Sequence, residues 1–419
     1  MRNDKSNRLF REIRIDYFIM VIDLNVLYES YLKSYKTSHK KMSAQEYRVN
    51  FLFNIVKASN ELESGKYQSS ECSHFLLNER GKERYITGVS FPDRVVHHAI
   101  CDNAIMPAIK PYLLKTNCAS QKGKGTEYQR EILDRQLRHY FKTHNTNVGY
   151  IALFDFSGFY DNIQHSKLIG KYRKVITDPY AMRALESTIR SYAVDVSWMS
   201  DSEYSECMNR KFKSVAAYKQ HKEDSKTGKK KMEKSVPIGD QISQDSGIFF
   251  PVRFDTLISC VYGLPHGRYT DDFYAISDSK ETLLRLRKDV EKLCKEEGLF
   301  LNEKKTQICR IDKSFHFLQD NYHLNETGRV VRKINRKRLH AERRRMKKYA
   351  RMVTEGTLSN EEAINRFVSW HNSFKKKLSK KQLKHLRCLA YRLYGKEEVW
   401  KKLKRTSLNC RTVQKSQQA

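Results

Sequence analysis

The chain has 419 residues, with 80 Lys and Arg against 48 Asp and Glu, which leaves a formal net charge of +32. This length is too great for one ordinary hydrophobic core and predicts about two or three subdomains. A charge excess of this size repels itself unless a polyanion shares the surface, so nucleic acid is the leading predicted partner. The sequence has no apolar run of about 18 residues and no signal-like N-terminal stretch, so we expect a cytoplasmic protein without a membrane partner.

The nine cysteines are scattered, and none forms a CxxC pair. Their number and spacing argue against a disulfide framework and against a structural zinc site. The sequence also lacks a GxxxxGK[ST] phosphate-binding loop, which excludes an ATP-driven motor or kinase of that type.

Residues 1–80 are predicted to be mainly helical, because apolar side chains recur at the spacing of one helix face. These side chains are Leu24, Leu27, Tyr31 and Leu32. Residues 84–100 begin with β-branched strand character and continue as a predicted helix beyond Pro92, where Asp93 can cap the first turn.

A Gly-Lys loop, SQKGKGT, precedes the next predicted helix. Its glycines would let the backbone and the cations of Lys122 and Lys124 approach a phosphate closely. A flexible surface turn is an equally good interpretation of these residues alone.

The segment YIALFDFSGFYDNIQH starts with an uninterrupted apolar run from Tyr150 to Phe154, which is typical of a strand buried on both faces. Asp155 ends that run. Active-site groups of α/β proteins lie at the carboxyl ends of buried strands, so Asp155 is a candidate catalytic residue. A structural Asp that caps the following turn is the alternative.

Residues 200–235 are polar and basic, with little apolar periodicity. We interpret them as an exposed insertion that orders on a partner or stays a solvated loop. The stretch VPIGDQISQDSGIFF, which follows, predicts a turn and then the start of a helix.

The stretch RYTDDFYAI places two adjacent carboxylates, Asp271 and Asp272, among strand-forming aromatic residues. Asp is depleted from strands, and adjacent like charges repel unless a cation lies near them. The surrounding pattern predicts a β-hairpin with the Asp pair at its tip. On this dipeptide alone, a tip that faces solvent is the simplest interpretation.

A helix is predicted after the hairpin, with Asp278 and Glu281 at capping-box spacing and Gly298 at its end. Its apolar side consists of Leu283, Leu286, Val290 and Leu293. Residues 329–350 hold eleven Lys and Arg against one acid, Glu342. Because a solvated helix normally mixes both signs, this block favours contact with a phosphate backbone. The residues after it predict a basic helical bundle.

The three aspartates Asp155, Asp271 and Asp272 would converge if their strands lie in one sheet. Three carboxylates in a strongly basic protein suit a pair of Mg²⁺ ions, which prefer oxygen ligands. Two such ions, about 3.5–4 Å apart, activate an attacking 3′-hydroxyl and stabilise a leaving pyrophosphate. Two-metal sites also serve nucleases and phosphatases, so metal chemistry alone leaves the reaction open.

The order and wording of four segments resemble the palm and fingers motifs of reverse transcriptases. FDFSGFYDNI resembles the motif with the first catalytic Asp, and RYTDDFYAI resembles the YxDD hairpin with the other two. GLFLNEKKTQI resembles the helix-strand motif with a Lys near the active site, and FHFLQDNYHL resembles the motif that ends the palm. The resemblance covers about residues 80–375.

This resemblance implies an α+β right-hand polymerase fold, an RNA-directed DNA polymerase activity and two Mg²⁺ ions, with Mn²⁺ as a substitute. Asp155, Asp271 and Asp272 would bind the catalytic metals. The implied domains are an N-terminal helical region at 1–80, fingers at 81–145, a palm at 146–320 that includes a fingers segment and the insertion, and a helical thumb with a C-terminal extension at 321–419.

The resemblance also assigns binding roles to single residues. Arg84 matches the fingers Arg that contacts the incoming triphosphate, with a surface ion pair as the alternative. Tyr160 matches the bulky residue that packs under the sugar and excludes a 2′-hydroxyl, with a core Tyr as the alternative. The other implied nucleotide contacts are Ile238, Gln244, and Lys305 or its neighbour Lys304. The implied nucleic-acid contacts are Lys122, Lys124, Arg343, Arg344 and Arg345.

Two features depart from the common pattern. Many reverse transcriptases have PQGxxxSP where this chain has PIGDQISQ, so Ile238 replaces a Gln beside the nascent base pair and Gln244 replaces a Pro. The lost hydrogen-bonding group puts normal fidelity in doubt. In addition, nothing after residue 375 resembles an HNH endonuclease or RNase H.

The pattern is similar to bacterial enzymes of the diversity-generating retroelement kind and to the related defence-associated group, and the segments NETGRVVRKINRKRLHAERRRMKKY and SWHNSF favour the latter. We therefore expect cDNA synthesis from dNTPs in phage defence, with a noncoding RNA or template RNA and with a protein partner or a second copy of the chain. The alternatives are an error-prone diversity-generating enzyme, a maturase-like RNA-binding scaffold without chemistry, and a metal-dependent nuclease.

Overall fold

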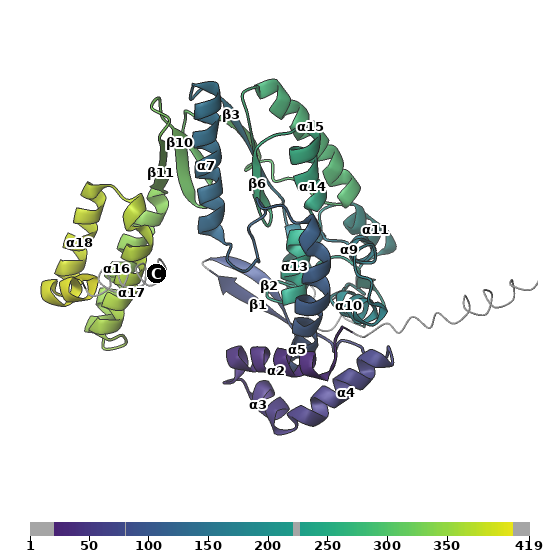
Figure 1. Cartoon of the computed structure of the whole chain (residues 1–419). Coiled ribbons are helices and arrows are strands. Elements are labelled where there is room, and N and C mark those ends of the chain that lie inside the picture. Colours follow the sequence, from purple (N-terminus) through teal and green to yellow (C-terminus); the bar gives the residue numbers. More distant parts are fainter. Residues whose placement is uncertain (1–20, 80, 221–226, 405–419) are drawn as a thin grey trace, which may run out of the picture. The chain divides into compact units, whose positions relative to one another are not determined.

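A computed structural model describes residues 21–79, 81–220 and 227–404 (Figure 1). The expectations for residues 1–20 and 405–419 therefore fall outside the described residues. The chain divides into two compact units: Met1–Leu133 with Ala152–Ile308 form unit 1, and Asp134–Ile151 with Cys309–Ala419 form unit 2. Among the described residues, no helix has the length and apolar character needed to cross a membrane.

Unit 1 begins with helices α2 (Leu24–Ser38), α3 (Met42–Val49) and α4 (Phe51–Glu63), as expected from the sequence. The predicted apolar face of α2 is only half right, because Leu27 and Tyr31 are buried whereas Leu24 and Leu32 are exposed. The helical region was expected to extend to residue 80, but the helices end earlier. Strands β1 (Ser73–Glu79) and β2 (Lys82–Gly88) form an antiparallel hairpin that begins within the expected region.

Helix α5 (Phe91–Ile100) follows this hairpin, close to where it was predicted. Its N-cap is Ser90, whose hydroxyl accepts a hydrogen bond from the Asp93 amide at 3.2 Å, so the prediction that Asp93 caps the helix is wrong. Asp93 is buried in the first turn instead, where its carboxylate accepts a hydrogen bond from the Tyr67 hydroxyl at 2.8 Å.

The central sheet has four strands in the order β6-β7-β3-β8. These are β6 (His266–Tyr269), β7 (Asp272–Ser277), β3 (Tyr150–Asp155) and β8 (Gln307–Arg310). Strand β3 is buried from its second residue onward, and β6 pairs with β7 as an antiparallel hairpin, so both strand predictions are confirmed. The sheet thus brings together two segments that are more than 100 residues apart in the sequence.

Helix α15 (Lys280–Glu297) follows β7 and contacts it (Figure 1). The predicted apolar side is buried, and Gly298 ends the helix with a positive φ of 73°, a conformation that glycine adopts without strain. The predicted cap is wrong by one residue. The side chain of Ser279, not that of Asp278, accepts the hydrogen bond from the Thr282 amide.

Other helices complete unit 1, and α7 starts in unit 1 and ends in unit 2. They are η1 (Cys101–Ile105), α6 (Met106–Ile109), η2 (Lys110–Tyr112), α7 (Thr126–His144), α8 (Phe159–Asn162), α9 (His165–Tyr172), α10 (Pro179–Ser191), α13 (Gln241–Phe249), α14 (Val252–Thr256) and η3 (Leu257–Val261).

The basic insertion at 200–235 forms ordered elements of unit 1 where it is described, so the expectation of an irregular solvated loop is wrong there, although most residues of its first helix are exposed as expected. It contains α11 (Asp201–Asn209), α12 (Ser214–Gln220) and β5 (Lys231–Met232), which pairs with β4 (Val194–Asp195). A few apolar side chains suffice to hold it, because Phe212 and Met232 are buried in one cluster with Tyr85. Residues 221–226 lie outside the described part.

Unit 2 contains a three-stranded antiparallel sheet and a helical bundle. The strands, in the order β11-β10-β9, are β9 (Phe315–Phe317), β10 (Asp320–Leu324) and β11 (Val330–Ile334). The helices are α16 (Arg336–Thr354), α17 (Asn360–Phe374), η4 (Lys375–Lys377) and α18 (Lys380–Tyr394). The predicted basic helices are therefore present, although the basic block at 329–350 starts as strand β11.

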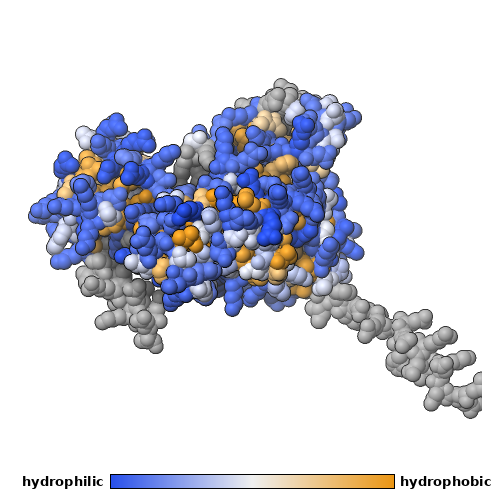
Figure 2. All heavy atoms as spheres, turned by 90° about the horizontal axis from the view of Figure 1, so that it is seen from above, coloured by the Kyte–Doolittle hydropathy of each residue, from blue (hydrophilic) through white to orange (hydrophobic). Residues whose placement is uncertain are grey.

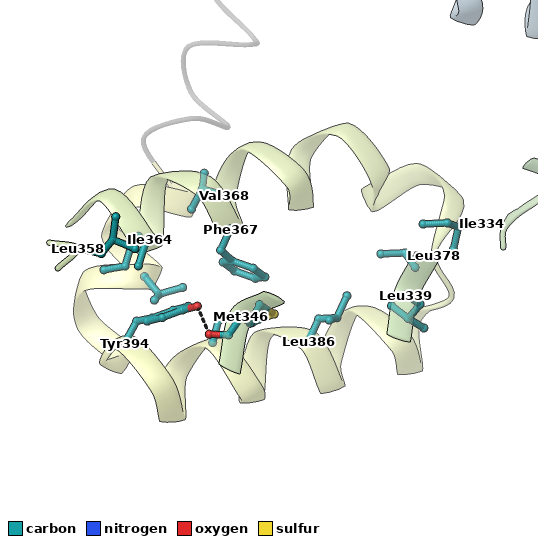
Figure 3. Packing of buried hydrophobic residues seen from close by; sticks show 13 residues of the cluster. Ile334, Leu339, Met346, Leu358, Ile364, Phe367, Val368, Leu378, Leu386 and Tyr394 are labelled. Carbon is teal, nitrogen blue, oxygen red and sulfur yellow. Dashed lines mark hydrogen bonds between the residues drawn. The ribbon is translucent and has the colours of Figure 1, made fainter. Parts of the chain in front are cut away.

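One apolar cluster holds the bundle of unit 2 together, and its side chains point toward one another in Figure 3. At one end of the cluster, the Tyr394 hydroxyl donates a hydrogen bond to the Met346 carbonyl at 2.7 Å (Figure 3). The face of the molecule drawn in Figure 2 is mainly hydrophilic with small scattered hydrophobic patches, as expected for a chain of net charge +32.

Candidate active site

Three carboxylates meet at one end of the central sheet of unit 1. Asp155 is the last residue of β3, Asp271 lies in the turn of the β6-β7 hairpin, and Asp272 is the first residue of β7. The Phe156 amide donates a hydrogen bond to the Asp271 carbonyl at 3.3 Å, and Asp272 forms a side-chain hydrogen bond with Asp155. The convergence expected from the sequence is therefore present.

The electrostatics of this carboxylate cluster are unfavourable for three negative charges. Burial raises the pKa of Asp271, and the neighbouring Asp155 raises it further. Burial raises the pKa of Asp272 to about 8, with Asp271 and Asp155 adding to the effect. Such shifts mean that the cluster lacks sufficient positive charge to keep all its members ionised at neutral pH.

Asp155 has two polar partners from the loop that follows α15. Lys305 Nζ donates to Asp155 Oδ1 at 2.6 Å, and Asn302 Nδ2 donates to Oδ2 at 3.0 Å. Burial alone would lower the pKa of Lys305, but the hydrogen bond to Asp155 and the charges of the three aspartates together outweigh burial and raise the pKa. Of the two lysines considered from the sequence, Lys305 and not Lys304 thus reaches the cluster. Asn302 was missed, although it stands in the same NEKK segment.

A buried ion pair fixes the hairpin that carries Asp271 and Asp272, and the sequence reasoning missed it. Arg268 and Asp255 are 0% and 2% exposed, and Arg268 Nη2 lies 2.7 Å from Asp255 Oδ2. The same guanidinium donates to the carbonyls of Ile248 at 2.8 Å and Thr270 at 3.1 Å. It therefore joins α13, α14 and the turn of the β6-β7 hairpin. A charged residue within a predicted strand, shortly before TDD, was the available signal.

Tyr160 and Arg84 lie close enough to Asp271 of the carboxylate cluster to interact with its charge. Burial raises the pKa of Tyr160 to about 12, and the charge of Asp271 contributes. The Tyr160 ring packs on Gly247 of α13, because a Cβ atom built on Gly247 would lie 2.6 Å from the Tyr160 hydroxyl. Arg84, on β2, lowers the pKa of Asp271 by its charge, although burial and Asp155 raise that pKa overall.

Ile238 and Gln244 lie on either side of the start of α13. Ile238 is 37% exposed and precedes Gly239, whose φ of 114° only glycine adopts readily. Gln244 is exposed in the first turns of the helix. Between them, the buried Asp240 carboxylate accepts hydrogen bonds from the Tyr192 hydroxyl at 2.5 Å and is 3.1 Å from His97 Nδ1. This network fixes the helix start beneath the two predicted contacts.

The two lysines of the Gly-Lys loop differ in their surroundings. Lys122 is exposed, as expected for a phosphate contact. Lys124 Nζ donates to the Asn117 carbonyl at 3.1 Å and to Gln121 Oε1 at 2.9 Å, so its ammonium holds the loop together. Treating the two lysines as equivalent contacts is therefore not supported by their geometry.

The three consecutive arginines of α16 in unit 2 also differ in their surroundings. Arg343 and Arg344 line a groove of about 560 Å³ on α16, together with Lys337, His340 and Lys347. Arg345 instead donates to the buried carboxylate of Glu342 at 2.9 Å. We name the face formed by Lys337, His340, Arg343, Arg344 and Lys347 the basic face of α16.

The carboxylate cluster suits divalent cations by the chemistry of its donors. Among the residues that the structure describes, no group of three His, Cys, Asp or Glu side chains has the geometry of a formed metal site. The donors are nevertheless carboxylate oxygens, the ligands that Mg²⁺ prefers, and their raised pKa values show a deficit of positive charge that a cation would relieve.

Comparison with known protein families agrees with this geometry. The family model described as reverse transcriptase (RNA-dependent DNA polymerase) matches residues 78–319, which is more than half of the chain. The match includes β3, the β6-β7 hairpin and Lys305, and it implies the right-hand polymerase fold, with which the antiparallel strands and helices are consistent. A search of curated proteins finds no match. The chain belongs to the reverse transcriptase family.

Proposed function

We infer that the protein copies an RNA template into DNA at the carboxylate cluster, with Asp155, Asp271 and Asp272 as the residues that hold two Mg²⁺ ions. The observation that carries this proposal is the convergence of three carboxylates, one buried and two half-buried, from two distant parts of a reverse transcriptase chain. When bound, the ions activate the attacking 3′-hydroxyl and stabilise the leaving pyrophosphate. Mn²⁺, which also accepts oxygen ligands, is the expected substitute.

The surrounding residues orient this cluster and bind the nucleotide. Lys305 and Asn302 fix the carboxylate of Asp155 through their two hydrogen bonds. Arg84 binds the triphosphate of the incoming dNTP as a cation of β2. Tyr160 lies under the sugar and excludes a 2′-hydroxyl, which favours dNTPs over ribonucleotides.

Residues at the start of α13 contact the incoming nucleotide and its template base. Ile238 and Gln244 lie beside the nascent base pair, where Ile238 offers packing without a hydrogen bond. The partly exposed side chain of Ile238 supports this role. The basic face of α16 binds the nucleic-acid backbone, and Lys122 adds a further exposed cation in unit 1.

The biological role that we propose is cDNA synthesis in bacterial antiviral defence, in the cytoplasm, with a noncoding RNA and a protein partner or a second copy of the chain. The segments NETGRVVRKINRKRLHAERRRMKKY and SWHNSF support this choice. Error-prone synthesis for sequence diversification is the alternative. It is supported by Ile238, which stands where many reverse transcriptases have Gln.

Primer extension on an RNA template, with dNTPs and Mg²⁺, tests the proposed activity. The wild type should lengthen a labelled primer, and the variant with Asp271→Ala and Asp272→Ala should not, while both bind the primer–template equally. Lengthening by the double variant contradicts the proposed site. Shortened primer would indicate a nuclease, and binding without either reaction would indicate a maturase-like scaffold.

A further inference from the structure

The basic insertion reaches the turn that directly follows Asp155. The residues involved are 207–214, at the end of α11 and the start of α12, which we call the 207–214 segment. Its position was not expected from its polar composition. The contacts of this segment suggest what the insertion does.

A buried lysine fixes the 207–214 segment from within the insertion. Lys234 is 0% exposed, and its Nζ donates to the carbonyls of Cys207 at 3.0 Å and Arg210 at 2.6 Å. A lysine at the C-terminal end of a helix satisfies carbonyls that otherwise lack partners and complements the helix dipole. The backbone around residue 210 is therefore held in one place.

Hydrogen bonds also join the segment to α8, the short helix that follows the turn after Asp155. The Phe212 amide donates to Asn162 Oδ1 at 3.0 Å, and the Ser214 hydroxyl donates to Asp161 Oδ1 at 2.6 Å. Both Phe212 and Ser214 are buried. Two fixed residues thus lie on the C-terminal side of Lys211, and the bonded carbonyl of residue 210 lies on its other side.

Lys211 is exposed between these anchors, and its Nζ donates a hydrogen bond to the Ser157 hydroxyl. Its Cε would lie 3.4 Å from a Cβ atom built on Gly158, so the aliphatic stem lies along the turn. Among the described residues, none places a carboxylate at ion-pair distance from this ammonium. Its hydrogen-bond partner is a neutral hydroxyl.

Neutralising Asp161 is the simplest alternative role for Lys211. Burial raises the pKa of Asp161, and the Ser214 hydrogen bond opposes this more than the charge of Lys211 does. Asp161 already has its hydrogen-bond partner in Ser214, so the ammonium is not required to satisfy it. The fixed, solvent-exposed cation of Lys211 beside the turn that follows Asp155 therefore needs another role.

We propose that Lys211 binds the triphosphate of the incoming nucleotide, so that the basic insertion supplies a cation to the active site. This inference rests on the proposed polymerase function. Ser157 stands between Asp155, which holds the metal, and Tyr160, which lies under the sugar, so the triphosphate passes beside this turn. Within the described part of the chain, the ammonium has no carboxylate partner to release when it meets a phosphate, and its stem is already positioned along the turn.

Steady-state kinetics of single-nucleotide incorporation test the role of Lys211. Lys211→Met should raise KM for dNTP about tenfold, the effect of one lost charge-assisted hydrogen bond, with kcat changed less than about twofold. Lys211→Arg should keep most of the affinity, because it keeps the charge. Lys213→Met is the matched control: it removes the same charge from an exposed neighbour in the same segment and should leave KM unchanged.

Two binding measurements separate this role from the alternatives. Inorganic tripolyphosphate should raise the melting temperature of the wild type and Lys213→Met more than that of Lys211→Met. The Kd for primer–template should be the same in all three. The proposal would be overturned if Lys211→Met and Lys213→Met changed KM and the melting-temperature shift equally. It would also be overturned if Lys211→Met alone bound the primer–template more weakly. If the wild type incorporates no nucleotide, the polymerase function fails, and the tripolyphosphate shift still decides the role of Lys211.

Discussion

The carboxylate cluster of unit 1 and the basic face of α16 in unit 2 use charge in opposite ways. In the cluster, a few charged groups lie at a sheet edge where Asp155 is buried and Asp271 and Asp272 are half-buried, and they are held by individual hydrogen bonds such as that from Lys305 to Asp155. On the basic face, charged groups of one sign recur at helical spacing on the surface, while the apolar side of the helix holds the bundle. Buried charges depend on each partner, whereas exposed charges act by their number and are screened by salt.

The largest expected effect is the loss of the buried Arg268–Asp255 pair that fixes the β6-β7 hairpin. Arg268→Met leaves Asp255 buried without its partner and should lower the free energy of unfolding by about 3–5 kcal/mol, measured by urea denaturation. Arg287→Ala removes an exposed pair with Glu291 and should cost at most about 0.5 kcal/mol.

The Arg268–Asp255 pair offers a second test. Combining Arg268→Met with Asp255→Leu should recover part of the lost stability, because no unpaired charge then remains buried. Primer extension should stay low in this double variant, because the hydrogen bond from Arg268 to the Thr270 carbonyl is still missing. Equal stability losses for the Arg268 and Arg287 variants would contradict the contrast between buried and exposed charge.

The next effect concerns the packing of Tyr160 on α13. Gly247→Ala places a methyl group 2.6 Å from the Tyr160 hydroxyl, so the ring must move, and we expect KM for dNTP to rise about tenfold with a changed dNTP-to-rNTP preference. Gly170→Ala in α9 is the control, because a Cβ atom there meets nothing within 4 Å. It should stabilise the helix slightly and leave KM unchanged.

Removing the Tyr160 hydroxyl should relieve the closest of these contacts. The double variant Gly247→Ala with Tyr160→Phe is therefore expected to recover part of the dNTP affinity. If Gly247→Ala behaves like Gly170→Ala in both KM and selectivity, Tyr160 does not define the sugar site.

A smaller effect follows from proton binding at the cluster. Because the pKa of Asp272 is about 8 in the native protein and 3.8 is its usual value, the metal-free native state holds a proton that the unfolded chain loses. The contribution of this carboxyl to stability therefore falls as pH rises from about 4 to about 8. Mg²⁺ competes with that proton, so its stabilising effect should be larger near pH 9 than near pH 6.

Thermal unfolding with and without Mg²⁺ measures this difference. Asp272→Asn cannot lose a proton and should remove the pH dependence of the Mg²⁺ shift. A shift of equal size at both pH values in the wild type would mean that Asp272 does not take part in metal binding.

The smallest expected effect belongs to the basic face of α16. Replacing Arg343 and Arg344 by Ala should weaken RNA binding several-fold and reduce the slope of log K against log salt by about 1–2. Arg345→Ala removes a charge three residues from its buried partner Glu342, so it should lower stability more than it changes the salt slope. Identical salt slopes for the two variants would contradict the view that Arg343 and Arg344 contact RNA whereas Arg345 stabilises the helix.

Local patterns in the sequence predicted much of the sheet edge that carries the three carboxylates. The apolar run before Asp155 and the aromatic residues around Asp271 and Asp272 gave a buried strand and a hairpin, both of which are present. Gly298 marked the end of α15 because a left-handed residue is needed there. Such features depend on neighbours in the chain, which a single sequence displays.

Contacts between distant residues escaped prediction. Nothing near Arg268 identifies Asp255 as its partner, because the pair forms only when β6 packs on α14. The insertion looked irregular because its order depends on a few buried side chains, such as Phe212, and on the buried ammonium of Lys234. Composition counts all residues equally and cannot show which of them are buried.

Metal-directed cleavage tests the central claim most directly, since it asks whether Asp155 and the β6-β7 hairpin share one metal site. Fe²⁺ in place of Mg²⁺, with ascorbate and peroxide, should cut the backbone near residue 155 and also near residues 271–272. Excess Mg²⁺ should suppress both cuts together, and the variant with Asp271→Ala and Asp272→Ala should lose both. Cuts at only one of the two places, or a cut near 155 that survives in the double variant, would contradict a shared site.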